Sequence, residues 1–265
     1  MKKLIVVLVC AVCVLALAST AVPAAEQGGR IGFGAAFIPD YEGSDDMQGW
    51  PTVFGRYTWE NGIFVDLGSS SDGRAARAKG NVIQERWVDI LKAGPVLQYR
   101  FERDDVDDDQ VDNMKSVDSA VEVGGFVGLV IERWSVNLTV VTDISDEHDG
   151  NLAELTGAYM WPVNDRLDLT FGAGATYADD DYMETYFGVS LVDSIRSGLP
   201  VYDADSGIKD VGVSVAAQYS FNERWGMLGA IRYNRMLGDA EDSPVVDDIG
   251  NDNQFFLSVA AVYSF

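Results

Sequence analysis

Apolar and polar residues alternate with a period of two along most of the chain. In residues 211–221 the odd positions are apolar or aromatic, and the even positions carry Gly, Ser, Ala or Gln. Residues 134–144, 167–177 and 254–265 repeat the pattern. Successive side chains of a strand point to opposite faces, so this alternation predicts amphipathic β-strands. The runs cover about ten to fourteen residues. They exceed ordinary strands of about 5–6 residues and suit tilted membrane strands of ~9–11 residues.

The connections between these runs differ in length in a regular way. Short connections fall at residues 60–62, 132–133, 162–165 and 222–223. Long acidic connections fall at residues 39–50, 102–117, 179–206 and 238–252. Outer-membrane barrels have short periplasmic turns and longer outer loops. The pattern therefore predicts an all-β fold, a transmembrane antiparallel β-barrel with short periplasmic turns, long acidic outer loops and both termini in the periplasm.

With both termini in the periplasm, the number of spanning strands must be even, and the count is about twelve. We expect strands near residues 30–38, 51–59, 62–69, 74–82, 89–101, 118–132, 134–145, 150–162, 165–177, 208–221, 224–238 and 252–265. Residues Tyr182 to Ser190 also look extended, but one more spanning strand would break the parity. We therefore expect residues 178–207 to form one long excursion over or into the barrel. A fourteen-strand barrel with a hairpin there is the alternative, and a soluble secreted β-sandwich is the competing fold.

The first 25 residues have the composition of a targeting segment. Lys2 and Lys3 precede a continuous apolar run from Leu4 to Ala18, and small residues follow. This is the pattern of a secretory signal peptide, with cleavage expected after Ala24 or Ala25. The expected organisation is a signal peptide over residues 1–25 and a single outer-membrane barrel domain over residues 26–265. No later segment approaches 18 consecutive apolar residues, so no transmembrane helix is expected.

Charge and cysteine content narrow the classes of function. The chain has 42 acidic and 19 basic residues, a formal net charge of −23, so nucleic acid phosphates would be repelled. Its two cysteines, Cys10 and Cys13, both lie in the expected signal peptide, and His148 is the single histidine. The remaining chain thus has no thiol nucleophile and no Cys/His zinc site. We expect no catalytic, cofactor-binding or metal site and no enzymatic activity.

Short motifs spread over about 230 residues resemble the MipA/OmpV family of outer-membrane proteins. The pieces are Pro39-Asp40-Tyr41-Glu42-Gly43-Ser44, Gly94-Pro95 with Tyr99-Arg100-Phe101, Tyr186-Phe187-Gly188-Val189, Ser197-Gly198-Leu199 with Tyr202, Leu237-Gly238-Asp239-Ala240, Asp242-Ser243-Pro244-Val245-Val246 and the closing Val262-Tyr263-Ser264-Phe265. The resemblance implies an outer-membrane barrel of a Gram-negative bacterium without enzymatic activity. It implies as partners a murein transglycosylase and a penicillin-binding protein, which one family member joins as a scaffold. Other members are described as adhesins or as proteins that affect permeability. The strongly acidic loops depart from the family's usual pattern.

The last strand ends in Phe265, with Tyr263 two residues before it. A C-terminal aromatic residue on an alternating strand resembles the signal that the barrel-assembly machinery binds. Strand-edge pairing would supply affinity, and alternate side chains would supply specificity. Ordinary lipid-facing packing is the alternative role for both residues.

The acidic loops offer carboxylates, which are suitable ligands for Ca²⁺. None matches the EF-hand pattern, so we expect solvated loops that share divalent cations with lipopolysaccharide. A dedicated Ca²⁺ site is the alternative. The clusters are Asp104, Asp105, Asp107, Asp108 and Asp109; Asp146, Glu147 and Asp149; Asp179, Asp180 and Asp181; and Asp247, Asp248 and Asp252.

His148 is the only possible imidazole base, and Ser145 lies near it in the sequence. A lipid hydrolase would need a serine, a histidine and an orienting group within hydrogen-bond reach. His148 is instead expected in an exposed turn, which disfavours that hypothesis. Tyr41 is expected to anchor its loop rather than to contact a ligand.

Charged residues at lumen-facing positions come from different strands. Opposite charges could cross-link the lumen, which favours a plugged or narrow barrel, or they could line a small pore. They are Arg30, Arg56, Lys92, Arg100, Glu122, Asp143, Glu154, Asp168 and Arg232. Three hypotheses of function follow: an envelope scaffold linked to murein enzymes, a narrow channel for small solutes, and a surface adhesin that uses the acidic loops.

Overall fold

The structure is a computed structural model that describes residues 28–83 and 90–265. The expected signal peptide, residues 1–25, lies outside the described residues. So does residue 89, the expected first residue of the fifth strand.

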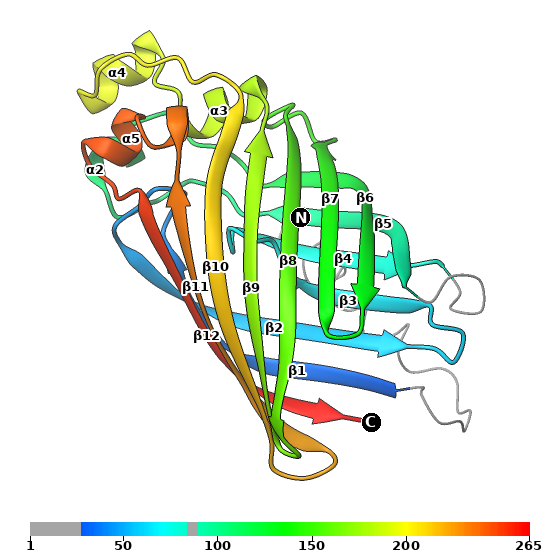
Figure 1. Ribbon diagram of the computed structural model, residues 1–265. Coiled ribbons are helices and arrows are strands. Elements are labelled where there is room, and N and C mark those ends of the chain that lie inside the picture. Colours follow the sequence, from blue (N-terminus) through cyan, green and yellow to red (C-terminus); the bar gives the residue numbers. More distant parts are fainter. Residues whose placement is uncertain (1–27, 84–89) are drawn as a thin grey trace.

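Twelve antiparallel strands among the described residues close into a barrel (Figure 1). Each strand pairs with its neighbours in the chain, and the first pairs with the last. The twelve-strand prediction is confirmed, and the β-sandwich alternative is wrong. The strands are β1 (Gly28–Pro39), β2 (Met47–Thr58), β3 (Phe64–Ser69), β4 (Ala75–Asn81), β5 (Leu91–Arg100), β6 (Ala120–Ile131), β7 (Trp134–Asp143), β8 (Asn151–Asn164), β9 (Leu167–Ala178), β10 (Gly207–Ser220), β11 (Trp225–Met236) and β12 (Asn253–Ser264).

The outer surface of the barrel carries the apolar half of each alternation. Val213, Ile231 and Leu257 are exposed on three successive strands, as a lipid-facing wall requires. Trp134 and Trp225 are exposed at the end with the short turns, where aromatic residues meet the membrane–water interface. That end corresponds to the periplasmic side of outer-membrane barrels, and the end with long loops to the outer side.

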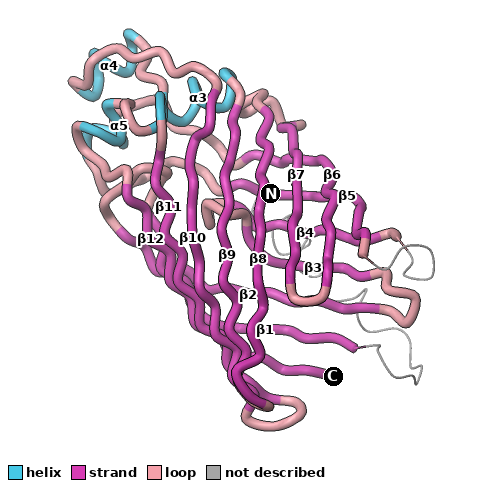
Figure 2. Tube along the Cα trace, viewed as in Figure 1, coloured by secondary structure: helices cyan, strands magenta, loops and turns pink. Residues whose placement is uncertain are grey.

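Short helices gather at the outer end (Figure 2). They are α2 (Asp109–Asp112), α3 (Asp180–Phe187), α4 (Leu191–Ser197), the 3₁₀ turn η1 (Gly238–Ala240) and α5 (Pro244–Asp247). None of the helices in the described part of the chain is long and apolar enough to cross a bilayer.

The expected extended segment from Tyr182 to Ser190 is wrong. Most of it forms α3, because Tyr182 with Tyr186 and Met183 with Phe187 repeat at helical spacing and are all buried. Asp179 caps the helix by accepting a hydrogen bond from the Tyr182 amide. Residues 178–207 therefore make one long excursion over the barrel mouth, and the fourteen-strand alternative is wrong.

The barrel closes where β1 pairs with β12, from Arg30 opposite Ser264 to Phe37 opposite Leu257. The seam continues as Gly29 and Phe265 exchange two backbone hydrogen bonds, 2.8 and 2.9 Å long. A Cβ atom on Gly34 would lie 1.9 Å from the Val259 carbonyl oxygen. The two strands can approach this closely because residue 34 has no side chain.

We expect Gly34→Val to weaken or prevent closure, since overpacking against backbone costs ~1–3 kcal/mol or more. The measurement is the refolded fraction of purified protein in detergent, read from the heat-dependent mobility of folded barrels in gels. Ala35→Val, a lipid-facing change on the same strand, is the matched control. Equal folding of the two variants would contradict this account of the seam.

Candidate functional site: the capped lumen

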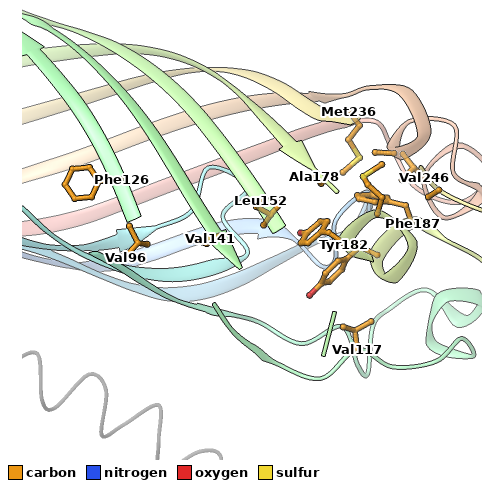
Figure 3. Packing of buried hydrophobic residues seen from close by; sticks show 14 of the residues in the cluster. Val96, Val117, Phe126, Val141, Leu152, Ala178, Tyr182, Phe187, Met236 and Val246 are labelled. Atoms are coloured by element: carbon orange, nitrogen blue, oxygen red, sulfur yellow. The ribbon is translucent and has the colours of Figure 1, made fainter. Parts of the chain in front are cut away.

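The outer loops fold together into a cap over the barrel mouth. The cap comprises residues 40–46, 101–119, 144–150, 179–206 and 237–252, which connect strands at the outer end. Figure 3 shows Tyr182, Phe187, Met236 and Val246 gathered there, and all four side chains are buried. A second cluster, which includes Tyr41, Val111 and Leu199, continues the apolar interior of the cap. Tyr41 thus anchors its loop, as expected.

Beneath this apolar layer lies a buried cluster of charged side chains, the mouth cluster. Arg100 is at its centre: its Nε donates to Glu122 Oε1 at 2.7 Å, and its Nη1 donates to Asp72 Oδ2 at 2.9 Å. Glu42 Oε1 accepts from the Tyr182 hydroxyl at 2.9 Å. The mouth cluster consists of Glu42, Asp72, Arg100, Glu122, His148, Lys209 and Asp210.

A β-bulge supplies two members of the mouth cluster from adjacent positions. The register of β10 against β9 shifts between Ile208 and Asp210. Lys209 and Asp210 are consequently both buried, where strict alternation would expose one of them. Lys209 Nζ lies 2.7 Å from Asp210 Oδ2 and 3.4 Å from Glu42 Oε1.

The mouth cluster belongs to a longer network that crosses the lumen. Gln98 donates to Glu122 and accepts from Arg77 Nε at 2.5 Å. Arg77 also makes a bidentate contact with Glu154, at 3.1 Å for both bonds. Because these side chains come from β4, β5, β6 and β8 and are buried, they tie opposite parts of the wall together.

Asp72 enters the lumen because the turn of the β3–β4 hairpin, residues 70–74, folds inward. Ser71 donates to Glu154 from both its amide and its hydroxyl. Arg74 is buried and donates to the carbonyls of Pro39 and Glu102, at 3.2 and 3.1 Å. The hairpin turn is therefore an internal plug rather than an outer loop.

The pKa values of Glu42 and Asp72 are shifted in opposite directions. Burial raises the pKa of Glu42, and Asp72 adds to the rise against the opposing effect of Lys209 and Arg100. Burial alone would also raise the pKa of Asp72, but Arg100 and Lys209 hold it well below the usual range. Within the described residues Glu42 Oε2 has no hydrogen-bond partner. Glu42 is therefore the more readily protonated carboxyl group of the two.

His148 lies in the mouth cluster, so its expected place in an exposed turn is wrong. Its side chain is 1% exposed, and its Nε2 lies 3.0 Å from Glu122 Oε1. The loop folds inward because the Asp143 carboxylate accepts amide hydrogen bonds from Ser145, Glu147 and His148. The Ser145 hydroxyl donates to Asp143 at 2.6 Å, and the Gly150 amide donates to His148 Nδ1. Both histidine nitrogens are thus engaged by groups other than Ser145, which leaves no serine–histidine pair here for hydrolysis.

Several of the residues that carry the family resemblance come together in the cap. Gly43 has φ of +96°, and a Cβ atom there would lie 2.5 Å from Val246. The Ser243 hydroxyl donates to the Phe187 carbonyl at 2.6 Å, and the Tyr202 hydroxyl donates to the Asp239 carbonyl at 3.1 Å. These contacts join loops that are far apart in the sequence. The resemblance positions in or at the edge of the cap are Pro39, Tyr41, Gly43, Ser44, Tyr186, Phe187, Gly188, Asp239, Ser243 and Pro244.

The other charged residues predicted to face the lumen lie outside the mouth cluster. Arg30 donates to Gln218 at 3.1 Å near the periplasmic end, and Arg56 pairs with Asp66 at 2.6 Å. Lys92 and Asp168 occupy strand positions nearer the short turns. The expectation that opposite charges cross-link the lumen is confirmed. The sequence pattern did not predict that the charge pairs also include Glu42, Asp66, Asp72, Arg77 and Lys209.

The two C-terminal aromatic residues lie at the seam of the barrel. Phe265 stacks on Tyr57 with ring centroids 6.3 Å apart, and on Tyr263 with ring centroids 6.2 Å apart. This contact accounts for a packing role of both residues. Their recognition by the barrel-assembly machinery stays a prediction.

The acidic loop residues are dispersed in the folded cap. Asp108 and Asp179 serve as helix N-caps. Across residues 28–83 and 90–265, no three His, Cys, Asp or Glu side chains form a group that could hold a metal ion. The dedicated Ca²⁺ site stays an alternative without a geometric basis in this part of the chain.

Two substitutions in the mouth cluster should lower the free energy of unfolding by different amounts. We expect Asp72→Asn to destabilise the barrel by ~3–5 kcal/mol, because it breaks one of the ion pairs of the buried Arg100. Glu42→Gln should cost clearly less, because burial already disfavours the ionised form of Glu42. Urea unfolding in detergent micelles, followed by tryptophan fluorescence, gives both free energies. A larger loss for Glu42→Gln than for Asp72→Asn would show that the directions of the two pKa shifts are reversed.

The same pair predicts a pH dependence. The folded pKa of Asp72 lies below its unfolded pKa of about 3.9, so its contribution is present above that value and is lost as pH falls toward the folded pKa. The stability of Asp72→Asn should therefore fall less between pH 5 and pH 3 than that of the unsubstituted protein. Parallel stability–pH curves for the two proteins would refute this assignment.

Similar proteins place this barrel in a family. The chain is 29% identical to the "Putative outer membrane protein YiaT" of Escherichia coli K12 over 63% of its length and 65% of that relative. It is 24% identical to the "MltA-interacting protein" of E. coli K12 over 88% of its length and 90% of that relative. The chain thus spans just under two thirds of the first of these relatives.

The comparison with solved structures gives low-similarity matches to outer-membrane proteins. The NanC porin has a TM-score of 0.48 at 10% identity, over 88% of this chain and 98% of the porin. An outer membrane channel from Pseudomonas putida F1 has a TM-score of 0.41 at 12% identity, over 92% and 97%. A family model described as "MltA-interacting protein MipA" matches residues 31–265. The chain is an outer-membrane β-barrel that belongs to the MltA-interacting protein (MipA) family.

Proposed function

We propose that this protein is a non-enzymatic, non-conducting barrel that acts as an interaction protein of the cell envelope. The observation that carries the proposal is the closed outer mouth. Arg100 and Glu122 are 1% and 0% exposed beneath a packed apolar layer. A solute path through the mouth would have to break several buried charge pairs at once, each of which costs several kcal/mol to separate. A passive channel would not be built in this way.

The partner proposed on the periplasmic side is a murein transglycosylase, with a penicillin-binding protein as a further member of the assembly. The name of the relative from E. coli supports the first, and the family resemblance implies the second. The short turns offer a specific contact surface. Three of them carry an acidic residue followed by arginine, with all six side chains exposed: Glu132-Arg133, Asp165-Arg166 and Glu223-Arg224.

These turns can be altered without loss of the fold. The carbonyl groups of Arg133, Arg166 and Arg224 accept backbone hydrogen bonds from Met160, Ser220 and Ser264 of the adjacent strands, so reversing the side-chain charges leaves those bonds in place. Exposed charges at a protein interface set specificity and association rate. The turns therefore form a rim on which a periplasmic partner could be recognised.

Charge reversal of this rim tests the scaffold. We expect the triple variant Arg133→Glu, Arg166→Glu and Arg224→Glu to retain at most about a tenth of the murein enzymes that co-purify with the tagged protein from detergent-solubilised envelopes. Arg196→Glu, on the exposed face of α4 in the cap, is the matched control. The scaffold proposal fails if murein enzymes are not enriched over an unrelated barrel, or if both variants recover equal amounts.

Planar-bilayer recording tests the closed mouth. We expect no unitary conductance from the intact protein. A variant in which short Gly-Ser linkers replace residues 180–205 and residues 70–74 should conduct, because it lacks both α3 and α4 above the mouth and the inward β3–β4 turn that carries Asp72. Steady conductance of the intact protein, at a level similar to the linker variant, would contradict the proposal of a non-conducting scaffold and favour a channel.

A second candidate, a surface adhesin, is favoured by one apolar patch on the cap. Leu191, Val192, Ile195 and Val201 are 53–77% exposed on and beside α4, and patches of this kind often mark interaction sites. The segment 102–117 is less suitable for adhesion, because Val111, Met114 and Val117 are buried. Cell or matrix binding that falls at least tenfold in Ile195→Asp, but not in Arg196→Glu, would favour adhesion. Equal binding by both variants would rule out adhesion through this apolar patch.

A further inference from the structure

One edge of β2 has no strand partner over its outer half. β2 pairs with β1 along its whole length, from Gly28 opposite Thr58 to Pro39 opposite Met47. Its pairing with β3 covers Gly55–Thr58 alone among the described residues. An unpaired edge facing hydrocarbon is costly, and membrane proteins tolerate it where it borders a cavity or is covered by protein.

The gap arises because β3 and β4 are short and their connecting turn folds into the lumen. β3 has six residues and β4 has seven, against twelve in β2. Arg74, in that turn, donates to the Pro39 carbonyl at the end of β1 and to the Glu102 carbonyl after β5. This guanidinium group spans the outer rim of the gap. We call the opening between residues 47–54 of β2 and the outer ends of β3, β4 and β5 the window.

Two aromatic rings lie across the window. Trp50 of β2 stacks on Phe101, which follows β5, with ring centroids 5.6 Å apart and planes inclined by 10°. Trp50 is paired with Ala36, a lumen-side position, yet it is 40% exposed. The stack holds the two sides together through side chains where backbone pairing is missing.

An apolar cavity of about 380 Å³ lies behind the window. Its lining includes Trp50 and Phe101 at the window and Ile38, Phe54, Leu228 and Phe256 inside. The volume falls in the lower part of the range of ligand sites, ~300–1,000 Å³. Lumens of outer-membrane barrels are ordinarily polar, so an apolar cavity that continues into the lipid-facing wall requires an explanation.

A single arginine lies at the inner boundary of the cavity. Arg232 lines both the apolar cavity and a polar lumen cavity of about 290 Å³. Its Nη1 donates to the carbonyls of Ser70 and Ser71. No carboxylate of the described residues lies within ion-pair distance of this guanidinium, unlike those of Arg77 and Arg100. Arg232 thus presents a positive charge to whatever occupies the cavity.

We propose that the apolar cavity binds the hydrocarbon chain of a free long-chain fatty acid, which enters from the membrane through the window and places its carboxylate at Arg232. Burial of the chain supplies affinity, and a charge-assisted hydrogen bond to the guanidinium fixes the polar end. A cavity of this volume has room for one chain, and one cation lies at its inner end. Both features match a single-chain anion better than a two-chain phospholipid.

Photo-crosslinking in vesicles tests the proposal. The full-length protein is reconstituted into phosphatidylethanolamine–phosphatidylglycerol vesicles that contain a diazirine-bearing palmitic acid. After illumination, mass spectrometry locates the labelled peptides. We expect labelling at the cavity residues Phe54, Leu228 and Phe256, and competition by excess palmitate. Labelling confined to outward residues away from the cavity, such as Phe33 and Val259, would overturn the proposal. So would cavity labelling by the same diazirine on a phospholipid chain but not on the free acid.

Two variants, each with a matched control, probe the two halves of the site. Ala230→Phe fills the apolar cavity and should abolish the labelling, whereas Ala158→Phe, which projects into the polar cavity, should not. Arg232→Gln should weaken palmitate binding by roughly tenfold or more and leave palmitate methyl ester unaffected. Arg30→Gln, at the periplasmic end, is its control. Heat-dependent gel mobility verifies folding. Equal binding of acid and ester by Arg232→Gln and by the unsubstituted protein would refute the role of Arg232.

Discussion

Backbone hydrogen bonding in hydrocarbon is the constraint on which the rest of this structure depends. A strand in a membrane must find a partner on each edge, because no water is available to satisfy its N–H and C=O groups. Closure of β1 onto β12 meets this demand at the seam, and the seam in turn requires a residue as small as Gly34. Among the described residues, the outer half of β2 is an exception. There the wall is completed by an aromatic stack and by the guanidinium of Arg74 rather than by a strand.

The same turn that opens the wall also closes the mouth. Folding of residues 70–74 into the lumen removes the outer part of the β3–β4 hairpin from the wall and delivers Asp72 to Arg100. Arg100 then has acidic partners from the hairpin turn, from β6 and from the loop after β1. Because a buried charge without a partner is strongly destabilising, each of these segments depends on the others. The plugged mouth and the lateral window are therefore two consequences of one short hairpin.

The sequence was sufficient to predict the barrel but not the cap. Strands can be recognised locally, since alternation such as that of residues 211–221 directly records which face meets lipid. The cap is built from contacts between residues far apart in the chain, and such contacts produce no periodic pattern in the sequence. His148 was misplaced because its surroundings in the chain, Asp146, Glu147 and Asp149, suggest solvent, whereas the fold turns the histidine toward Glu122. Glu42 and Asp72 were missed because both lie in loops that re-enter. The helical spacing of Tyr182, Met183, Tyr186 and Phe187 was the one local signal available for α3.

The lumen divides into two halves of different chemistry. Toward β8 and β9 the wall presents Thr156, Thr176 and Glu154 to a polar cavity. Toward β1, β2 and β12 it presents Ile38, Phe54 and Phe256 to an apolar one. A pore for hydrated solutes gains nothing from the apolar half, and a solid structural plug would have filled it with side chains. Its position beside the unpaired stretch of β2 in the described barrel gives it access to the membrane. For that reason the asymmetry of the lumen is better explained by an amphiphile taken from the bilayer than by passage of a solute along the barrel axis.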